Sequence, residues 1–327
     1  MAKKLRVGFI GAGGISIGHF ERMNATKKAE VVALNDPSPA SLKRFYELCP
    51  GSDRLPVYSD YRDMIKAEQL DAVIVQSPHT VHCAQIRESL RRGLHVLAEK
   101  PMVCTIRDAK ALIKQAEKCG KVLMISYQRH FDPQFRYMRE QIRKGAIGEV
   151  EFVQAVLSQE WLRITANTWR QILAESGGGQ LNDSGSHLVD ILMWVTGMKV
   201  REVFAIQENF KGEVDINATL SMRFENGALG SLSIIGNAPG WWEDHTIVGS
   251  KGAFYLRQGA GLIQQDALGR QKPVRLPKYT KNPDANFVDA ILGKDQVQTP
   301  PECGLRVIEV TEAAWRSAAT GKPVRLL

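Results

Sequence analysis

The segment VGFIGAGGISIGHF, residues 7–20, decides the fold. A β-branched run over residues 5–10 leads into Gly11, Gly13 and Gly14, and a helical pattern follows. Glycines at this spacing permit a tight strand-to-helix reversal and let backbone N–H groups at the helix N-terminus approach a pyrophosphate. Ser16 stands where the GxGxxG pattern has its third glycine, and it is small enough for close helix–strand packing. The segment predicts a dinucleotide-binding turn, and a tight turn without a ligand is the alternative.

An acidic residue follows the second predicted strand, residues 31–35. Asp36 lies at about the expected interval of ~20 residues beyond the glycine turn, where a carboxylate binds ribose hydroxyls. Its charge would repel a 2′-phosphate, so the sequence predicts NAD, with NADP less favoured. The alternative is that Asp36 only shapes the turn before Pro37.

Short apolar runs alternate with helix-length amphipathic stretches in the first part of the chain. The runs cover residues 5–10, 31–35, 72–76, 95–98 and 122–126, and two of the intervening helices are predicted at 41–49 and 80–93. Strands that are apolar on both faces and separated by helices form a parallel sheet covered on both sides. Residues 1–126 are therefore predicted to form a doubly wound Rossmann domain that binds NAD.

The pattern changes in the second part, where longer strands alternate polar and apolar residues. These strands are predicted at 149–158, 201–207, 215–224 and 228–235, with the hairpin signal Asn226-Gly227 between the last two. Helices are predicted at 284–292 and 304–321, and the longest irregular segments at 175–183 and 257–283. Residues 127–327 are predicted to form an α+β domain for substrate binding and oligomerisation. Its sheet is large, open and mostly antiparallel, and its C-terminal helix is free to pack back on the first domain.

Composition excludes several classes of function. A chain of 327 residues with 44% hydrophobic and 24% charged residues is typical of a two-domain globular protein. The N-terminus leads directly into a strand without a signal-peptide pattern, and no apolar run is long enough to span a bilayer. The net charge of +8 is scattered, which argues against nucleic acid. Five cysteines without a CxxC motif fit a reducing compartment, so we expect a cytoplasmic protein without membrane or nucleic-acid partners.

A lysine stands directly after the fourth predicted strand run of the first domain, in AEKPM, residues 98–102. The carboxyl ends of parallel strands are where open α/β sheets bind ligands, so Lys100 is expected to face a cleft. The Lys100-Pro101 bond permits a cis peptide, which would fix the backbone there. A surface lysine in a loop is the alternative.

The segment NDSGSHLVDILMW, residues 182–194, combines a helix start with two titratable side chains. Asp183 or Ser184 is expected to cap the helix, and Gly197 to end it. Leu188, Ile191, Leu192 and Val195 form one buried stripe, with His187 at its edge in the first turn.

The helix dipole favours a neutral imidazole at this position, and a nearby carboxylate fixes its tautomer. Such an imidazole is a suitable general base. The alternatives are a structural histidine and a metal site formed by Asp183, His187 and Asp190, but without a further ligand cluster we predict no metal.

With these residues identified, the whole chain resembles the Gfo/Idh/MocA oxidoreductase family of glucose–fructose oxidoreductase and inositol-dehydrogenase-like enzymes. The resemblance rests on GAGGIS, on AEKP, on GGGQLNDSGSHLVD at 177–190 and on GKPV at 321–324. It implies that the nicotinamide lies between the two domains. It also implies that His187 takes a proton from the substrate hydroxyl, that Lys100 hydrogen-bonds this hydroxyl, and that Asp183 binds a neighbouring hydroxyl or orients His187.

The resemblance extends to further site residues. His79, in SPHTVH at 77–82, replaces the family's usual asparagine, which leaves its role open. Arg129 belongs to a segment resembling the domain junction, and residues 161–170 resemble a substrate loop of sugar-modifying members. The implied cofactor-binding residues are Gly11, Gly13, Gly14, Ile15, Asp36, Ser77, Pro78, His82, Glu99 and Lys100. The implied substrate-binding residues are Lys100, Arg129, Trp161, Trp169, Arg170, Asp183 and His187, although each tryptophan could instead be a packing residue.

The predicted function is that of an NAD(H)-dependent dehydrogenase acting on a secondary hydroxyl of a sugar, polyol or related cyclic substrate. One alternative is transient oxidation by bound NAD during glycoside hydrolysis or epimerisation, and another is a non-catalytic dinucleotide-binding regulator. The resemblance implies a homodimer or homotetramer formed through the C-terminal sheet. The alternating apolar residues of strands 201–207, 215–224 and 228–235 are the expected interface.

Overall fold

The computed structural model describes residues 3–326. Contacts divide the chain into two compact units. The first contains the chain up to Gln128 together with Lys281–Leu305, and the second contains Arg129–Thr280 and the chain from Arg306 onward. Lys281–Leu305 therefore belongs to the first unit although it follows eight of the nine strands of the second unit's sheet in sequence.

The first unit is built on a six-stranded parallel sheet with the order β3-β2-β1-β4-β5-β6, as expected of a Rossmann domain. All five predicted strands are present. The strand β3 has only two residues and was not predicted from the sequence, because so short a run carries no periodic signal. The strands are β1 (Leu5–Ile10), β2 (Ala29–Asn35), β3 (Val57–Tyr58), β4 (Ala72–Val75), β5 (His95–Ala98) and β6 (Leu123–Ile125).

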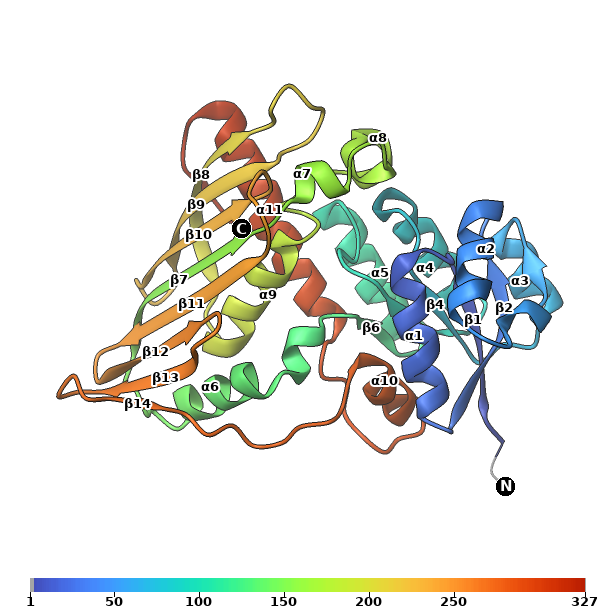
Figure 1. Cartoon of the computed structure of the whole chain (residues 1–327), viewed down its shortest axis with the longest axis horizontal. Coiled ribbons are helices and arrows are strands. Elements are labelled where there is room, and N and C mark those ends of the chain that lie inside the picture. Colours follow the sequence, from blue (N-terminus) through green and yellow to red (C-terminus); the bar gives the residue numbers. More distant parts are fainter. Residues whose placement is uncertain (1–2, 327) are drawn as a thin grey trace. The chain divides into compact units, whose positions relative to one another are not determined.

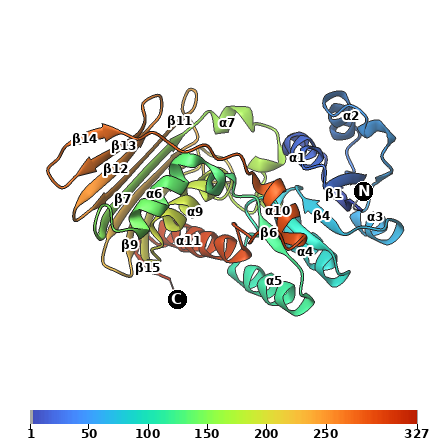
Figure 2. The same cartoon turned by 90° about the horizontal axis from the view of Figure 1, so that it is seen from below.

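Helices cover both faces of this sheet, with α1 and α2 on one side and α4 and α5 on the other (Figure 2). The central strands are correspondingly buried; Phe9 and Ile74, for example, are 0% exposed. The helices are α1 (Gly14–Ala25), α2 (Pro39–Leu48), α3 (Tyr61–Ala67), α4 (His82–Arg91), α5 (Ile106–Cys119) and α10 (Pro283–Ile291).

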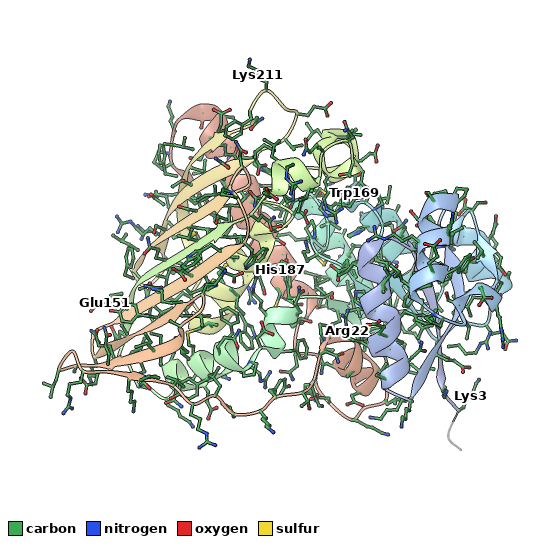
Figure 3. All side chains as sticks on the ribbon, viewed as in Figure 1. Lys3, Arg22, Glu151, Trp169, His187 and Lys211 are labelled. Carbon is green, nitrogen blue, oxygen red and sulfur yellow. The ribbon has the colours of Figure 1, made fainter. Side chains whose placement is uncertain are left out.

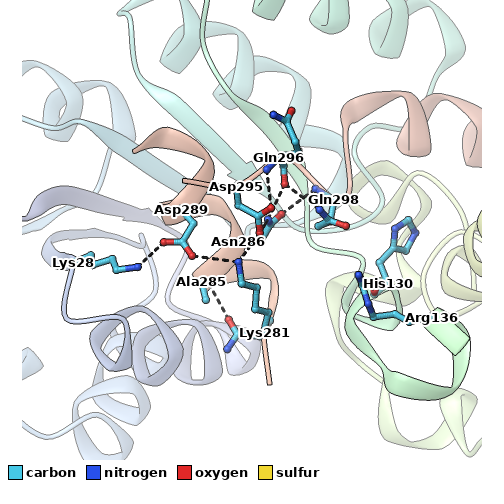
Figure 4. A network of polar contacts seen from close by, with 11 residues as sticks. Lys28, His130, Arg136, Lys281, Ala285, Asn286, Asp289, Asp295, Gln296 and Gln298 are labelled. Carbon is cyan, nitrogen blue, oxygen red and sulfur yellow. Dashed lines mark hydrogen bonds and ion pairs between the residues drawn. The ribbon is translucent and has the colours of Figure 1, made fainter. Parts of the chain in front are cut away.

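Helix α10, predicted at 284–292, packs against α1 and is fixed to the first unit by a polar network (Figure 4). Lys28 Nζ lies 2.6 Å from Asp289 Oδ1, and Lys281 Nζ lies 2.6 Å from Asp295 Oδ2. Asn286 donates to Asp295 Oδ2 and to the Gln296 carbonyl. Ion pairs and hydrogen bonds from the Asn286 side-chain amide thus hold residues 281–296 on the first unit.

The second unit is built on a nine-stranded sheet with the order β14-β13-β12-β11-β7-β10-β9-β8-β15 (Figure 1). Strands β7 and β10 pair in parallel and the other neighbours are antiparallel, which confirms the predicted mostly antiparallel sheet. The Asn226-Gly227 hairpin joins β9 to β10, with Gly227 at φ 91°. The strands are β7 (Val150–Ser158), β8 (Val200–Glu208), β9 (Asn217–Phe224), β10 (Leu229–Ile235), β11 (Trp242–Gly249), β12 (Gly252–Arg257), β13 (Gly261–Asp266), β14 (Gln271–Pro273) and β15 (Val324–Arg325).

The prediction that residues 257–283 are irregular was wrong, because β13 and β14 lie within this segment. Its glycines, prolines and glutamines give a weak strand pattern. Pairing with β12 supplies the order that local propensity does not, since β-propensity depends strongly on context.

The helices of the second unit lie on one face of its sheet (Figures 1 and 2). They are α6 (Pro133–Arg143), α9 (Gly185–Thr196) and α11 (Pro301–Thr320, from Arg306 onward), and the short α7 (Trp161–Ile164) and α8 (Leu173–Ser176) precede α9. The alternating apolar residues of β9 and β10, such as Leu220 and Leu232, are buried on this helix-covered face. The prediction that they supply an intersubunit interface was therefore wrong for β9, whose other face carries Thr219, Ser221 and Arg223.

None of the helices within residues 3–326 is both long and apolar enough to span a lipid bilayer.

Candidate functional site

The glycine turn is sterically tight at Gly11 and open at the start of α1. Gly11 has φ 103°, and a Cβ added there would lie 2.8 Å from the Gln76 carbonyl oxygen, so only glycine fits. A Cβ on Gly13 or Gly14, at the start of α1, would meet nothing within 4 Å. The backbone N–H groups at this helix N-terminus therefore have room for an anionic group, and Ile15 beside them is 44% exposed.

Asp36 shapes the turn in which it lies, which is one of the two roles that the sequence left open. Its Oδ2 accepts a hydrogen bond from the Ala12 N–H at 2.8 Å, and its Oδ1 accepts one from the Ser38 N–H at 2.8 Å. The carboxylate thus shapes its own turn and also places a negative charge beside the glycine turn. Its effect on the choice between NAD and NADP stays a prediction.

His82 joins two of the predicted cofactor-binding turns. Its Nε2 lies 2.9 Å from the Ser77 carbonyl oxygen and its Nδ1 lies 2.9 Å from the Pro101 carbonyl oxygen. Burial lowers the pKa of His82, although both carbonyls oppose this effect. The turn after β4 and the turn after β5 are therefore held together by one imidazole.

Lys100 follows β5, and the Lys100–Pro101 peptide bond is cis. The Lys100 N–H lies 3.2 Å from Glu99 Oε2, while Glu99 Oε1 lies 3.0 Å from Nε2 of His19 on α1. Burial raises the pKa of Glu99, but His19 and Lys100 outweigh burial and lower this pKa to about 2. The turn that presents Lys100 is thus supported by a buried, ionised carboxylate.

His187 lies in the first turn of α9 and is 8% exposed (Figure 3). The helix ends at Gly197 with φ 73°, as predicted. Of the two predicted caps, Ser184 occupies the N-cap position but makes no side-chain cap bond, and its hydroxyl instead accepts from Gln159 Nε2 at 2.6 Å. The residues Gly185–Val195 are all buried, so the helix is enclosed on every side and is not limited to one buried stripe.

Asp183 gathers three of the predicted substrate residues around it. Trp161 Nε1 donates to Asp183 Oδ2 at 2.9 Å, and Arg170 Nε donates to the same oxygen at 3.1 Å. The Arg170 guanidinium also lies 4.5 Å from the centre of the Trp169 ring, labelled in Figure 3. We call these four residues the Asp183 cluster.

The two tryptophans of the Asp183 cluster differ in exposure. Trp161 is 2% exposed and packs against Val214 and Ile216. Its ring is part of the core, so it acts on the site through Asp183. Trp169 is half-buried and has ring surface to offer a ligand.

Asp215 is a site-forming residue that the sequence analysis missed. It accepts hydrogen bonds from the Gly179 and Leu181 N–H groups at 3.0 and 2.8 Å and from Trp315 Nε1 at 3.0 Å. Burial raises its pKa, and these donors oppose the rise. A Cβ at Gly179 would lie 1.8 Å from the Asp215 carbonyl oxygen, which explains a glycine in the loop before Asp183. An acid within the apolar run VDI was the available signal.

Arg129 belongs to a different cluster from Asp183. It pairs with Glu243, whose Oε1 also lies 2.8 Å from His245 Nε2. Asp190 lies 2.6 Å from His130 Nε2. Among the described residues, Asp183, His187 and Asp190 do not bring three ligand atoms close enough together to share one metal ion, so the alternative metal set is not assembled.

Comparison with known proteins assigns both halves of the chain. Residues 5–127 match the model described as "Oxidoreductase family, NAD-binding Rossmann fold", and residues 135–255 match the Gfo/Idh/MocA C-terminal domain. The chain belongs to the Gfo/Idh/MocA oxidoreductase family. It is an NAD-binding oxidoreductase with dehydrogenase relatives.

The relatives are distant but extend over much of the chain. The uncharacterized oxidoreductase YrbE of Bacillus subtilis is 25% identical, over 100% of this chain and 98% of its own length. Myo-inositol 2-dehydrogenase of Thermotoga maritima is 26% identical over 77% of this chain and 75% of its own. The aldose-aldose oxidoreductase of Caulobacter crescentus, solved with glycerol, aligns with a TM-score of 0.85 and 24% identity over 99% of this chain and 100% of that one.

Proposed function

We propose that the protein is an NAD(H)-dependent dehydrogenase that acts on a secondary hydroxyl of a sugar, polyol or related cyclic substrate. The Asp183 cluster, one helical turn before His187, carries this proposal. A carboxylate, a guanidinium and a partly exposed indole are the groups that bind a polyhydroxylated ring, by hydrogen bonds and by stacking. A relative named for the oxidation of myo-inositol supports the same substrate class.

The cofactor is assigned to residues of the first unit. The Gly11–Gly14 turn would bind the pyrophosphate, Asp36 the ribose hydroxyls, and Ser77, Pro78, His82 and Glu99 would shape the remainder of the site. A nicotinamide held by these residues would supply the hydride acceptor for oxidation of the carbon that bears the substrate hydroxyl. The room beside Gly13 and Gly14 fits this assignment.

The chain's own residues would handle the proton. His187 takes the hydroxyl proton as general base, while Lys100 donates a hydrogen bond to the same oxygen and favours its ionised form. Asp183 binds a neighbouring hydroxyl and fixes the ring orientation. Trp161 and Arg170 hold the Asp183 carboxylate in place for this contact.

A panel of sugars, polyols and sugar acids, assayed by NADH absorbance with NAD and with NADP, tests the proposal. We expect at least one substrate class to be oxidised with NAD preferred. Substrate conversion with bound NAD recovered unchanged would instead assign transient oxidation. Binding of NADH without conversion of any member would contradict a sugar or polyol dehydrogenase.

The same preparation tests the role of Asp36. Asp36→Ala should weaken NAD binding and relax the exclusion of NADP, because the carboxylate would no longer repel a 2′-phosphate. Asp53→Ala, on the same unit but remote from the turn in sequence, serves as the control. Unchanged discrimination between the two cofactors would remove Asp36 from this role.

We also propose that the chain forms a homodimer or homotetramer through the face of the nine-stranded sheet opposite its helices. Phe152, Ile206 and Leu229 are 37, 65 and 45% exposed. An exposed apolar surface of this kind favours association. Light scattering should give a multiple of the 36.4 kDa chain mass, and Ile206→Glu should reduce it. A monomer for the unmodified chain would contradict the proposal.

A further inference from the structure

His19 is a fully buried histidine that the proposed chemistry does not use. It lies on the inward face of α1 with Ser16 and Met23, and it is 0% exposed. Its Nδ1 lies 2.6 Å from Asp284 Oδ1 on α10, and its Nε2 lies 3.0 Å from Glu99 Oε1. Both ring nitrogens therefore face carboxylate oxygens.

This geometry determines the protonation state of His19. A neutral imidazole has one N–H, so it could donate to only one carboxylate and would turn a lone pair toward the other. The imidazolium donates to both. Burial lowers the pKa of His19, but Asp284 and Glu99 outweigh burial and raise this pKa to about 9.

The imidazolium is part of a line of alternating charges within the first unit. Arg22 Nε lies 2.5 Å from Asp284 Oδ2, followed by His19, by Glu99 and by Lys100. These groups come from α1, from α10 and from the turn after β5. Ser126 also donates to Glu99. Because buried charges need paired partners, removing the central cation would leave two carboxylates without their shared donor.

We propose that His19, as an imidazolium, is a positioning residue for the Glu99–Lys100 turn and couples this turn to α1, the helix that begins at the dinucleotide turn. It fixes Glu99 Oε1, while Glu99 Oε2 accepts from the Lys100 N–H. The inference rests on the proposed function for the catalytic role of Lys100. The charge state of His19 and its tie to Glu99 do not depend on that role.

The first test needs no substrate. Nitrogen-15 spectra of the histidine side chains in the full-length protein should include a signal that stays protonated at both ring nitrogens from pH 6.5 to pH 8, and His19→Gln should remove that signal. A His19 signal with one bare nitrogen in this range would overturn the inference. This outcome is independent of any catalytic activity, so it separates a failure here from a failure of the proposed function.

The second test compares His19→Gln with Lys28→Gln. Lys28 follows α1 and bonds Asp289 on α10, and no described hydrogen bond or ion pair joins its side chain to Asp284 or Glu99. Lys28→Gln is therefore a matched loss of one cation that bonds an α10 carboxylate. His19→Gln should leave Glu99 with a raised pKa, shift the acid limb of the kcat–pH profile upward by a pH unit or more, and lower kcat about tenfold.

NADH affinity measured by fluorescence should change less than kcat, and Lys28→Gln should keep the original profile. Identical profiles for His19→Gln and the unmodified enzyme would overturn the positioning role. If His19→Gln does not fold, the spectra of the unmodified protein still decide whether the imidazolium exists.

Discussion

The two polar clusters of this molecule use similar groups in opposite ways. In the first unit, His19, Glu99 and Asp284 are 0 to 7% exposed and satisfy one another. In the second, Asp183 is buried but its partner Arg170 keeps 38% of its side chain exposed, and Trp169 is half-buried. Buried charges that are paired only with one another fix a backbone turn, here the Glu99–Lys100 turn. Charged groups that are partly exposed to solvent can instead exchange their contacts for contacts with a ligand. The comparison separates residues that hold a site from residues that touch a substrate.

The largest expected effect concerns His187, in the first turn of the helix that follows Asp183. His187→Ala should lower kcat by about 10²–10⁴-fold, the usual contribution of a general base, while NADH binding changes little. Steady-state kinetics and NADH fluorescence titration measure the two effects. Lys211→Ala, in the exposed loop between β8 and β9, should match the unmodified enzyme. Near-normal turnover by the His187 variant would show that His187 is not the general base.

The second prediction concerns the buried cluster of His19, Glu99 and Asp284 and the pH dependence of the free energy of unfolding. The pKa of His19 rises from 6.5 to about 9 on folding, so its contribution is fully present below pH 6.5 and is lost as the pH rises through about 9. Over this window the free energy of unfolding should fall by about 3 kcal/mol. Urea unfolding at several pH values measures this loss.

The matched variant isolates the contribution of His19. His19→Gln should be less stable at pH 6.5 and should show a flatter pH dependence up to about pH 9. Equal pH slopes for both proteins would mean that His19 does not hold its proton in the folded state.

A smaller effect is expected at Trp161, which is a buried core residue and also donates a hydrogen bond to Asp183. Trp161→Phe keeps a buried ring but removes the only indole donor to Asp183 Oδ2 among the described hydrogen bonds. Loss of a hydrogen bond to a carboxylate costs about 1.5–3 kcal/mol, so kcat/KM should fall by about 10- to 100-fold. Ile216→Val provides a core control without loss of a donor. If the two variants behave alike, Trp161 contributes packing only.

The sequence predicted those features that depend on local pattern. The glycine turn, Lys100 after its strand and His187 in the first helical turn follow from short segments, because their signals lie within about one turn or strand. The tie between His19 and Asp284 joins residues far apart in sequence, and no local period indicates it. Trp161 was identified as a site residue, but its burial against Val214 depended on tertiary packing. Contacts between remote segments therefore set the roles that the motifs left open.

The smallest expected effect concerns Arg170, on the open side of the comparison. With 38% of its side chain exposed, its pair with Asp183 is screened by solvent, so Arg170→Gln should change thermal stability little. If Arg170 contacts substrate, the variant should raise KM several-fold with a smaller change in kcat, because binding is weakened before and during the reaction alike. Arg163→Gln, paired with Glu160 on the neighbouring short helix, is the control for loss of a surface cation. A fall in stability without a change in KM would mean that Arg170 supports the position of Asp183 and does not contact the substrate.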